Sequence, residues 1–510
     1  MAAVVVALGV LTGGLALAAA GGGSGQSPAA GSHTFTVELA LLRRVSKPGG
    51  GWAPLHAGSI PPSQSPVSVA VWTGEAGLRV PDDFLGLSFE STTLSELPSI
   101  VRGGTLSRLL GSLGKGTLRF GGGTVNRYVA WEQPGSPAPS WATHPVSEAD
   151  FKALASVAHR TGWQVLLTMN LAHYDPTAVK QEAAAAQREL QGALAGIAIG
   201  NEPNSFGRFG LRGAGWDFSQ YAHQLAGYRG AVAAASPHAG IAAPDASTGE
   251  EPLPWVWESI GLHPTILTDH YYPLTRCGRK PTITQMLSPE VRLEETVMLS
   301  TLGDIQRTAR TPLELDETND VSCKGQPGVS NAYASALWAA DYIARAMRSG
   351  LRGIDFHDLP ELPLSYSPLV GEGSALHANP EWYALLLTHA LQGTSVLPTA
   401  VSPASDLTAQ GFLGAGGSVE LLLVNFAPVG SEPRTVALRL HGRSPATGTV
   451  LRLTGPSEGA TAGVQLGGEE VSPSGSWRPT LPLPAVSDHD GSMSLSMPPA
   501  SAALVTIPPP

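Results

Sequence analysis

The chain has 510 residues, 14% of them charged and 42% hydrophobic, so it can bury the core of one large domain and of a second, smaller one. The formal net charge is −10, and no run of lysine or arginine exceeds two residues, which argues against a nucleic-acid-binding protein. The two cysteines, Cys277 and Cys323, exclude a disulfide-rich scaffold and a four-cysteine zinc site but allow one disulfide bond.

The first 20 residues are apolar and end in Ala18–Ala20, a small-residue pattern typical of signal-peptide cleavage sites. No lysine or arginine precedes the apolar stretch, and its length is just sufficient to span a bilayer. We therefore expect residues 1–20 to be an export signal or an uncleaved anchor, on a secreted or extracytoplasmic protein with no other membrane insertion. Residues 21–66 are expected to form a linker that includes a short N-terminal strand.

Between residues 80 and 395, short apolar runs alternate with segments in which apolar residues have helical spacing. Each run is short enough for a strand buried on both faces, and eight such strand–helix units predict a (β/α)₈ barrel. A doubly wound sheet also alternates, but it often carries a phosphate-binding loop, and Gly121–Gly123 lacks the GxGxxG pattern. The eight runs are Leu85–Glu90, Thr117–Gly122, Gln164–Leu171, Ala195–Asn201, Gly240–Pro244, Ile266–Tyr272, Pro312–Thr318 and Gly353–His357.

After about residue 400 the pattern changes to short strand-like runs separated by turns rich in proline, glycine and serine. Val436, Leu438 and Leu440 alternate with less apolar residues, which is typical of a half-buried strand. The sequence therefore predicts an α/β fold with a barrel domain over residues 67–400 and a C-terminal β-sandwich over residues 401–510. The start of the barrel segment, residues 67–80, can add a strand to the sandwich.

Two glutamates mark the rim at which a barrel of this type carries its functional residues, the carboxyl ends of its strands. Glu202 follows the fourth predicted strand and Glu317 ends the seventh, so their side chains can approach each other over the barrel axis. Glycoside hydrolysis with retention needs two carboxyl groups about 5–5.5 Å apart, one as the nucleophile and one as the proton donor. The pair is therefore a candidate for this chemistry.

Glu317 has two competitors in the same run, Glu314 and Asp316. Strand alternation puts Glu317 on the opposite face from both, and its position at the end of the run favours it. Arg119 on the second strand and a tyrosine hydroxyl would keep such a nucleophile ionised. His270 has no HxxH pattern or second close histidine, so we expect neither a metal nor a cofactor. Four tryptophans are candidates for stacking on a sugar ring, although tryptophans more often lie in the core or at an interface. They are Trp131, Trp216, Trp255 and Trp257.

Four motifs make the sequence similar to glycoside hydrolase family 79, the group of microbial β-glucuronidases and heparanase within the clan A retaining hydrolases. They are Leu118–Gly122 (LRFGG), Gly200–Phe206 (GNEPNSF), His270–Tyr272 (HYY) and Glu317–Asn319 (ETN), and the resemblance covers roughly residues 67–400. The resemblance implies that Glu202 is the acid/base residue and that Glu317 is the nucleophile.

The same resemblance implies roles for the surrounding residues. Asn201 would bind the sugar 2-hydroxyl, Tyr271 would hydrogen-bond the nucleophile, and Glu90 would bind sugar hydroxyls. Tyr366, beyond the eighth strand, is the candidate for contact with the sugar carboxylate, in a stretch that lacks the glycines usual there. The full set of predicted substrate-binding residues is Glu90, Arg119, Asn201, His270, Tyr271, Tyr272 and Tyr366.

We therefore expect a retaining exo-β-glucuronidase that removes terminal β-linked glucuronic acid from glycans or glucuronide conjugates. Another specificity on the same fold stays open, either for a neutral sugar or as an endo-acting heparanase-like enzyme. Heparanase is the poorer match because residues 320–325 read DVSCKG where it has Tyr-Gly-Gly. A non-catalytic carbohydrate-binding protein on a degenerate barrel is a further alternative, against which the presence of both glutamates argues.

The cysteines also have a predicted place in this fold. Cys277 follows the sixth predicted strand and Cys323 follows the seventh, so both fall on the same rim as the two glutamates. We expect a disulfide bond between them that ties these two loops together.

Overall fold

The structure is a computed structural model that describes residues 66–509, apart from Pro134, Ser136, residues 248–251, Pro445, Ala446, Ser487 and residues 490–491. The predicted export segment and residues 21–65 of the predicted linker lie outside this part of the chain. A search of the described residues finds no helix with the length and apolar character needed to cross a membrane.

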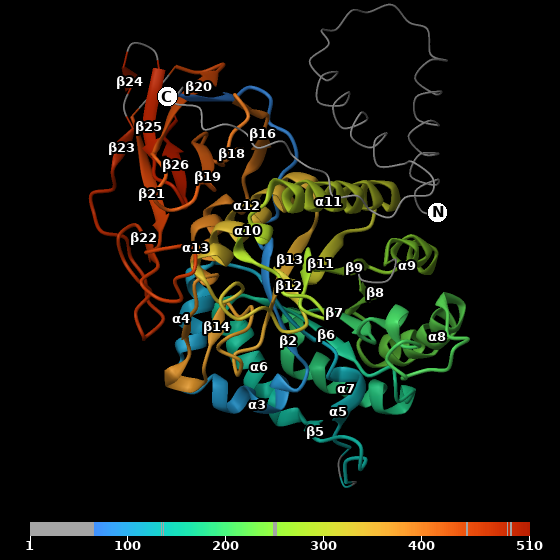
Figure 1. Cartoon of the computed structure of the whole chain (residues 1–510). Helices are drawn as coiled ribbons and strands as arrows, with labels where there is room; N and C mark the ends of the chain where they lie inside the picture. The colour runs from blue at the N-terminus through green and yellow to red at the C-terminus, as the bar shows by residue number, and fades with distance from the viewer. Residues whose placement is uncertain are drawn as a thin grey trace, which may run out of the picture. The chain divides into compact units, whose positions relative to one another are not determined.

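In the described part of the chain, eight parallel strands close into a barrel in the order β11-β13-β2-β3-β6-β7-β8-β9 (Figure 1). Their residues are mostly buried, as expected for strands covered on both faces. Each strand coincides with one of the eight predicted runs, which confirms the predicted barrel. The strands are β2 (Leu85–Glu90), β3 (Thr117–Gly121), β6 (Gln164–Met169), β7 (Leu194–Ile199), β8 (Gly240–Ser247), β9 (Ile266–Tyr271), β11 (Leu313–Thr318) and β13 (Gly353–Asp358).

Helices follow the barrel strands, and their first turns show the local signals that start them. Ser147 and Asp150 form a reciprocal capping box at α6, and the Asp175 carboxylate accepts two backbone N–H bonds at the start of α7. The helices are α3 (Thr93–Ile100), α4 (Thr105–Ser112), α5 (Val125–Tyr128), α6 (Glu148–Thr161), α7 (Pro176–Leu190), α8 (Phe218–Ala235), α9 (Pro252–Ser259), α10 (Ile283–Met286), α11 (Pro289–Ala309), α12 (Tyr333–Ser349) and α13 (Trp382–Thr388).

The C-terminal region forms a β-sandwich whose described strands make two sheets, in the orders β17-β1-β20-β25-β24 and β16-β18-β19-β26-β21-β22. Strand β1 (Val67–Trp72) lies between β17 and β20, so the first described strand belongs to the sandwich rather than to the barrel. The other strands are β16 (Ser395–Leu397), β17 (Thr399–Ser402), β18 (Leu407–Leu413), β19 (Val419–Asn425), β20 (Arg434–His441), β21 (Gly448–Thr454), β22 (Gln465–Leu466), β23 (Ala485–Val486), β24 (Asp488–His489), β25 (Ser492–Met497) and β26 (Ser501–Ile507).

Helix α12 joins the two domains. Nearly all of its side chains are buried, because it packs on barrel strand β13 and on sandwich strands β18, β19 and β26. The hydroxyl group of Tyr333, at its first residue, donates to the backbone oxygens of Leu453 (3.1 Å) and Ala500 (2.9 Å) in the sandwich.

The predicted disulfide bond is confirmed between Cys277 and Cys323, whose Cα atoms are 5.8 Å apart. Beside it, the short strands β10 (Leu274–Thr275) and β12 (Val321–Ser322) pair in parallel. The loop after β9 is thus fastened to the loop after β11 by one covalent bond and a small sheet.

Replacing both cysteines with serine is expected to lower the free energy of unfolding by about 4 kcal/mol, because the bond closes a loop with a sequence separation of 46 residues. Urea unfolding of the oxidised protein and of the double variant, followed by circular dichroism, measures the difference. Equal stability, or free thiols found when the wild-type protein is titrated in denaturant without reductant, would contradict this expectation.

Candidate active site

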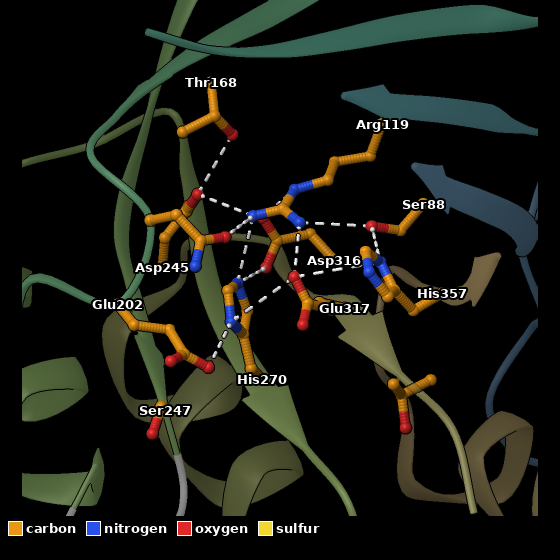
Figure 2. A network of polar contacts seen from close by, with 12 residues as sticks. Ser88, Arg119, Thr168, Glu202, Asp245, Ser247, His270, Asp316, Glu317 and His357 are labelled. Carbon is orange, nitrogen blue, oxygen red and sulfur yellow. Dashed lines mark hydrogen bonds and ion pairs between the residues drawn. The ribbon is translucent and has the colours of Figure 1, made fainter. Parts of the chain in front are cut away.

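Glu202 and Glu317 come together at the carboxyl end of the barrel, on either side of His270 (Figure 2). One oxygen of each carboxyl group and a ring nitrogen of His270 all lie within 4.8 Å of one another. The Nδ1 atom of His270 is 3.3 Å from Oε1 of Glu202 and 3.8 Å from Oε2 of Glu317. The two predicted glutamates therefore face one common space.

The backbone after β7 aims Glu202 into this space. Gly200 has a φ of 80°, and a Cβ atom at this position would lie 2.7 Å from the side chain of Leu171, so only glycine fits. Glu202 itself has a φ of 50°, a conformation that costs energy in a residue with a side chain and is common at functional sites. A hydrogen bond of 2.8 Å from its amide to the backbone oxygen of Asp245 holds it there.

Glu317 is held by two donors, one on each carboxylate oxygen. Nη1 of Arg119 donates to Oε2 at 2.7 Å, as predicted, and the hydroxyl group of Tyr272 donates to Oε1 at 3.0 Å. Burial alone would raise the pKa of Glu317, but the positive charges of His357, His270 and Arg119 outweigh it and hold the pKa well below the usual range. The carboxyl group is therefore ionised at neutral pH.

Arg119 is fully buried at the centre of this network. Its Nη2 atom donates to Oδ1 of Asn201 (2.8 Å) and to Oδ2 of Asp245 (3.2 Å), and its Nε atom lies 3.5 Å from Oδ2 of Asp316. Burial lowers the pKa of the guanidinium, but the charges of Asp316, Glu317 and Asp245 outweigh this effect and raise it. Arg119 thus stays charged and balances a cluster of buried acids.

The prediction that Tyr271 hydrogen-bonds the carboxylate of Glu317 is wrong, because Tyr272 makes that bond. Successive strand residues point to opposite sides, so His270 and Tyr272 share the inner side and Tyr271 points outward. The ring of Tyr271 packs instead against that of Tyr342 on α12, with 6.4 Å between their centroids.

Strand alternation predicted that Asp316 and Glu317 lie on opposite faces of β11. This prediction is also wrong, because both side chains reach Arg119. The pairing of β11 with β13 and with β9 shifts register near the end of the strand, which breaks the strict alternation. Asp245 and Asp316 were not predicted as site residues. The signal for Asp245 was an acid directly after a buried run, since the predicted strand ended at Pro244.

Glu90 and Tyr366 lie at the side of the site formed by β2 and the loop after β13. Glu90 accepts hydrogen bonds from the backbone and the hydroxyl group of Thr124, and Nε2 of His357 lies 3.7 Å from its Oε1 atom. The ring of Tyr366 is 5.6 Å from that of Tyr272 and 5.8 Å from that of His357. His357, which was not among the predicted site residues, therefore links Glu90 to the rest of the site.

The surroundings of His357 favour its protonated, positively charged form. Burial lowers its pKa, but the charge of Glu317 and the hydrogen bond and charge of Glu90 outweigh this effect and raise it. Its Nδ1 atom lies 3.9 Å from Oε2 of Glu317 and 3.1 Å from the hydroxyl oxygen of Ser88. The histidine thus supports the ionised state of both neighbouring carboxylates.

Two groups of described residues have the spacing of metal ligands, Glu202–His270–Glu317 and Asp245–His270–Asp316. Arg119 already contacts carboxylates of both groups and supplies the positive charge that a metal ion would bring. The donor set therefore fits metal-independent acid–base chemistry better than metal binding.

No family model and no curated protein matches the sequence. Among solved structures, the chain is similar to the 4-O-α-L-rhamnosyl-β-D-glucuronidase of Fusarium oxysporum 12S, with a TM-score of 0.72 and 18% identity, covering 86% of this chain and 100% of that one.

It is also similar to the GH51 arabinofuranosidase of Xanthomonas axonopodis pv. citri (TM-score 0.64, 14% identity, 87% and 99% coverage). A third similar structure is the glycoside hydrolase family 44 xyloglucanase of Paenibacillus polymyxa (TM-score 0.59, 11% identity, 87% and 99% coverage). These likenesses show the fold, a (β/α)₈ barrel with a C-terminal β-sandwich.

Proposed function

We propose that the chain is a retaining exo-β-glucuronidase that removes terminal β-linked glucuronic acid from glycans or glucuronide conjugates. The observation that carries the reaction class is the pair Glu202 and Glu317, with carboxylate oxygens within 4.8 Å of each other. Retaining glycosidases place their carboxyl groups about 5–5.5 Å apart, whereas inverting enzymes need roughly 6.5–9.5 Å to admit a water molecule.

The contacts of the two glutamates divide the roles between them. Glu317 accepts hydrogen bonds from Arg119 and Tyr272 and has a depressed pKa, so its carboxylate attacks the anomeric carbon as the nucleophile. The side chain of Glu202 is 22% exposed, against 9% for Glu317, and can reach both the leaving group and water.

In the first step Glu202 protonates the glycosidic oxygen while Glu317 forms a bond to the anomeric carbon and the aglycone leaves. In the second step Glu202 takes a proton from water, the water oxygen bonds to the anomeric carbon, and the bond to Glu317 breaks. Two inversions leave the sugar with its original anomeric configuration.

The preference for glucuronic acid has two supports. The Fusarium protein in the comparison is named a glucuronidase. Tyr366 lies beside Tyr272 and His357 on the loop after β13, where its hydroxyl group and the histidine offer contacts for a sugar carboxylate. We also propose an extracytoplasmic location, which the Cys277–Cys323 disulfide bond supports.

A panel of p-nitrophenyl glycosides tests the proposal. We expect the β-D-glucuronide to be hydrolysed with a higher kcat/KM than the β-D-glucoside, the β-D-galactoside and the α-L-arabinofuranoside, and NMR to show β-glucuronic acid as the first product. Preference for the arabinofuranoside would point to the activity named for the GH51 structure. Glycan binding without turnover of any glycoside would indicate a carbohydrate-binding protein.

Tyr272→Phe is expected to lower kcat/KM on the β-glucuronide by roughly 10- to 100-fold, because it removes the 3.0 Å hydrogen bond that positions Glu317. Tyr271→Phe is the matched control, since this neighbouring hydroxyl group belongs to a ring packed against α12. Steady-state kinetics of both variants checks the expectation. A larger loss in Tyr271→Phe than in Tyr272→Phe would refute the assignment.

A further inference from the structure

A cavity lies near the catalytic rim, between α7 and the loops that follow β3 and β6. Its volume is about 470 Å³, within the range of small-molecule sites. None of the described residues that hydrogen-bond Glu202 or Glu317 lines it. Helix α5 lies between the cavity and the Glu202–Glu317 site. Val125 of this helix lines the cavity, and the Asn126 side chain donates to the backbone oxygen of Asn201 (2.8 Å), the residue before Glu202.

Glu182 is the unusual member of this cavity wall. It lies on α7, is only 9% exposed, and makes no hydrogen bond or ion pair with any described residue. Its helix neighbours on the same face, Val179 and Ala186, are buried and apolar, so an apolar residue would suit the fold better. A carboxyl group that is nine-tenths buried, lacks a protein partner and lines a cavity is available to hydrogen-bond a molecule that enters the cavity.

The protonation state of the Glu182 carboxyl group indicates which kind of ligand the cavity can bind. Burial raises the pKa of Glu182 to about 8, so the group is mostly protonated at neutral pH and offers both a donor and an acceptor. No lysine or arginine is among the described residues that line the cavity, and Asp175 is engaged at the start of α7. The site therefore suits a neutral ligand with hydroxyl groups rather than an anion.

Aromatic rings supply flat apolar faces in the same cavity. The ring of Trp141 stacks on that of His173 with 3.6 Å between centroids and an angle of 4°, and Tyr174 is 45% exposed. Trp131 is also among the lining residues, although its ring stacks on that of Phe151 in the core. Aromatic faces pack well against the C–H faces of a pyranose ring, while its hydroxyl groups need polar partners such as the Glu182 carboxyl group.

We propose that this cavity is an accessory carbohydrate-binding site, in which Glu182 hydrogen-bonds and Trp141 stacks on a neutral pyranose unit. The assignment of a sugar rests on the proposed function, since a glycosidase meets such units in the chain that carries its cleavable residue. The site would then hold a substrate chain near the catalytic rim without touching the reacting bond.

Saturation-transfer NMR with methyl β-D-glucopyranoside, methyl β-D-galactopyranoside and methyl β-D-xylopyranoside tests this site. We expect at least one of them to bind, with a Kd raised at least about tenfold in Glu182→Leu and in Trp141→Ala. Glu189→Leu, on the same helix but outside the cavity lining, is the matched control and should leave the Kd unchanged.

Thermal unfolding shows that each variant is folded, and Glu182→Leu should be at least as stable as the wild-type protein because it removes a buried polar group. The proposal is overturned if no glycoside binds, or if Glu182→Leu binds as tightly as the wild-type protein. Since the readout is binding and not turnover, a chain without hydrolytic activity would still give a result for this cavity.

Discussion

Glu317→Ala is expected to lower kcat/KM on the p-nitrophenyl β-glucuronide by about 10⁴- to 10⁶-fold, because the covalent intermediate can no longer form. Because Glu317 also forms an ion pair with Arg119, thermal unfolding of the variant is needed to show that it is folded and that the loss lies in the chemical step. Azide should restore part of the activity by occupying the space of the missing carboxylate, and it should give the α-glucuronyl azide, with inverted configuration.

Glu202→Ala is the matched variant, because it removes the other carboxyl group of the pair. It should slow the cleavage of poor leaving groups far more than that of p-nitrophenol, which leaves without a proton. Azide should here give the β-glucuronyl azide, with retained configuration. Exchange of these two azide products between the variants would reverse the roles of Glu202 and Glu317.

Arg119→Met is expected to destabilise the protein by roughly 3–5 kcal/mol and to abolish activity, because it leaves the carboxyl groups of Asp245, Asp316 and Glu317 buried without their cation. Urea unfolding at pH 7 measures the loss. Arg188→Met, which breaks exposed ion pairs with Glu148 and Glu189, should change stability by no more than about 1 kcal/mol.

The destabilisation should depend on pH in a defined direction. Glu317 has a depressed pKa in the folded protein, so its pairing with Arg119 contributes stability above the unfolded pKa near 4.5 and loses it as the pH falls further. The difference between Arg119→Met and the wild-type protein should therefore be largest at neutral pH and shrink in acid. A difference that grows below pH 4 would contradict the account.

The barrel could be predicted because its strands are short apolar runs between amphipathic helices, and this pattern depends only on local burial. The positions of Glu202, Glu317 and Arg119 followed from the same logic, since the rim of a barrel is given by the ends of its strands. The disulfide bond followed too, because Cys277 and Cys323 come after adjacent strands.

The two errors about the site have different causes. The register shift in β11 allows Asp316 and Glu317 to contact the same residue, Arg119. No local sequence pattern in this run predicts the shift. Tyr271 and Tyr272 are identical in type, so only the direction of each side chain separates their roles. The cavity around Glu182 is lined by α7, by the loop directly before it and by the loop that follows β3, and local sequence patterns do not reveal that the loop after β3 contacts this helix.

The central claim, that Glu317 forms a covalent bond to the sugar, can be tested by trapping. The protein would be incubated with 2-deoxy-2-fluoro-β-D-glucuronyl fluoride, which forms the glycosyl-enzyme readily and releases it slowly, and then digested for mass spectrometry. We expect one added 2-fluoroglucuronyl group, located on Glu317. A label on another carboxyl group, or unlabelled protein that still hydrolyses β-glucuronides, would contradict it.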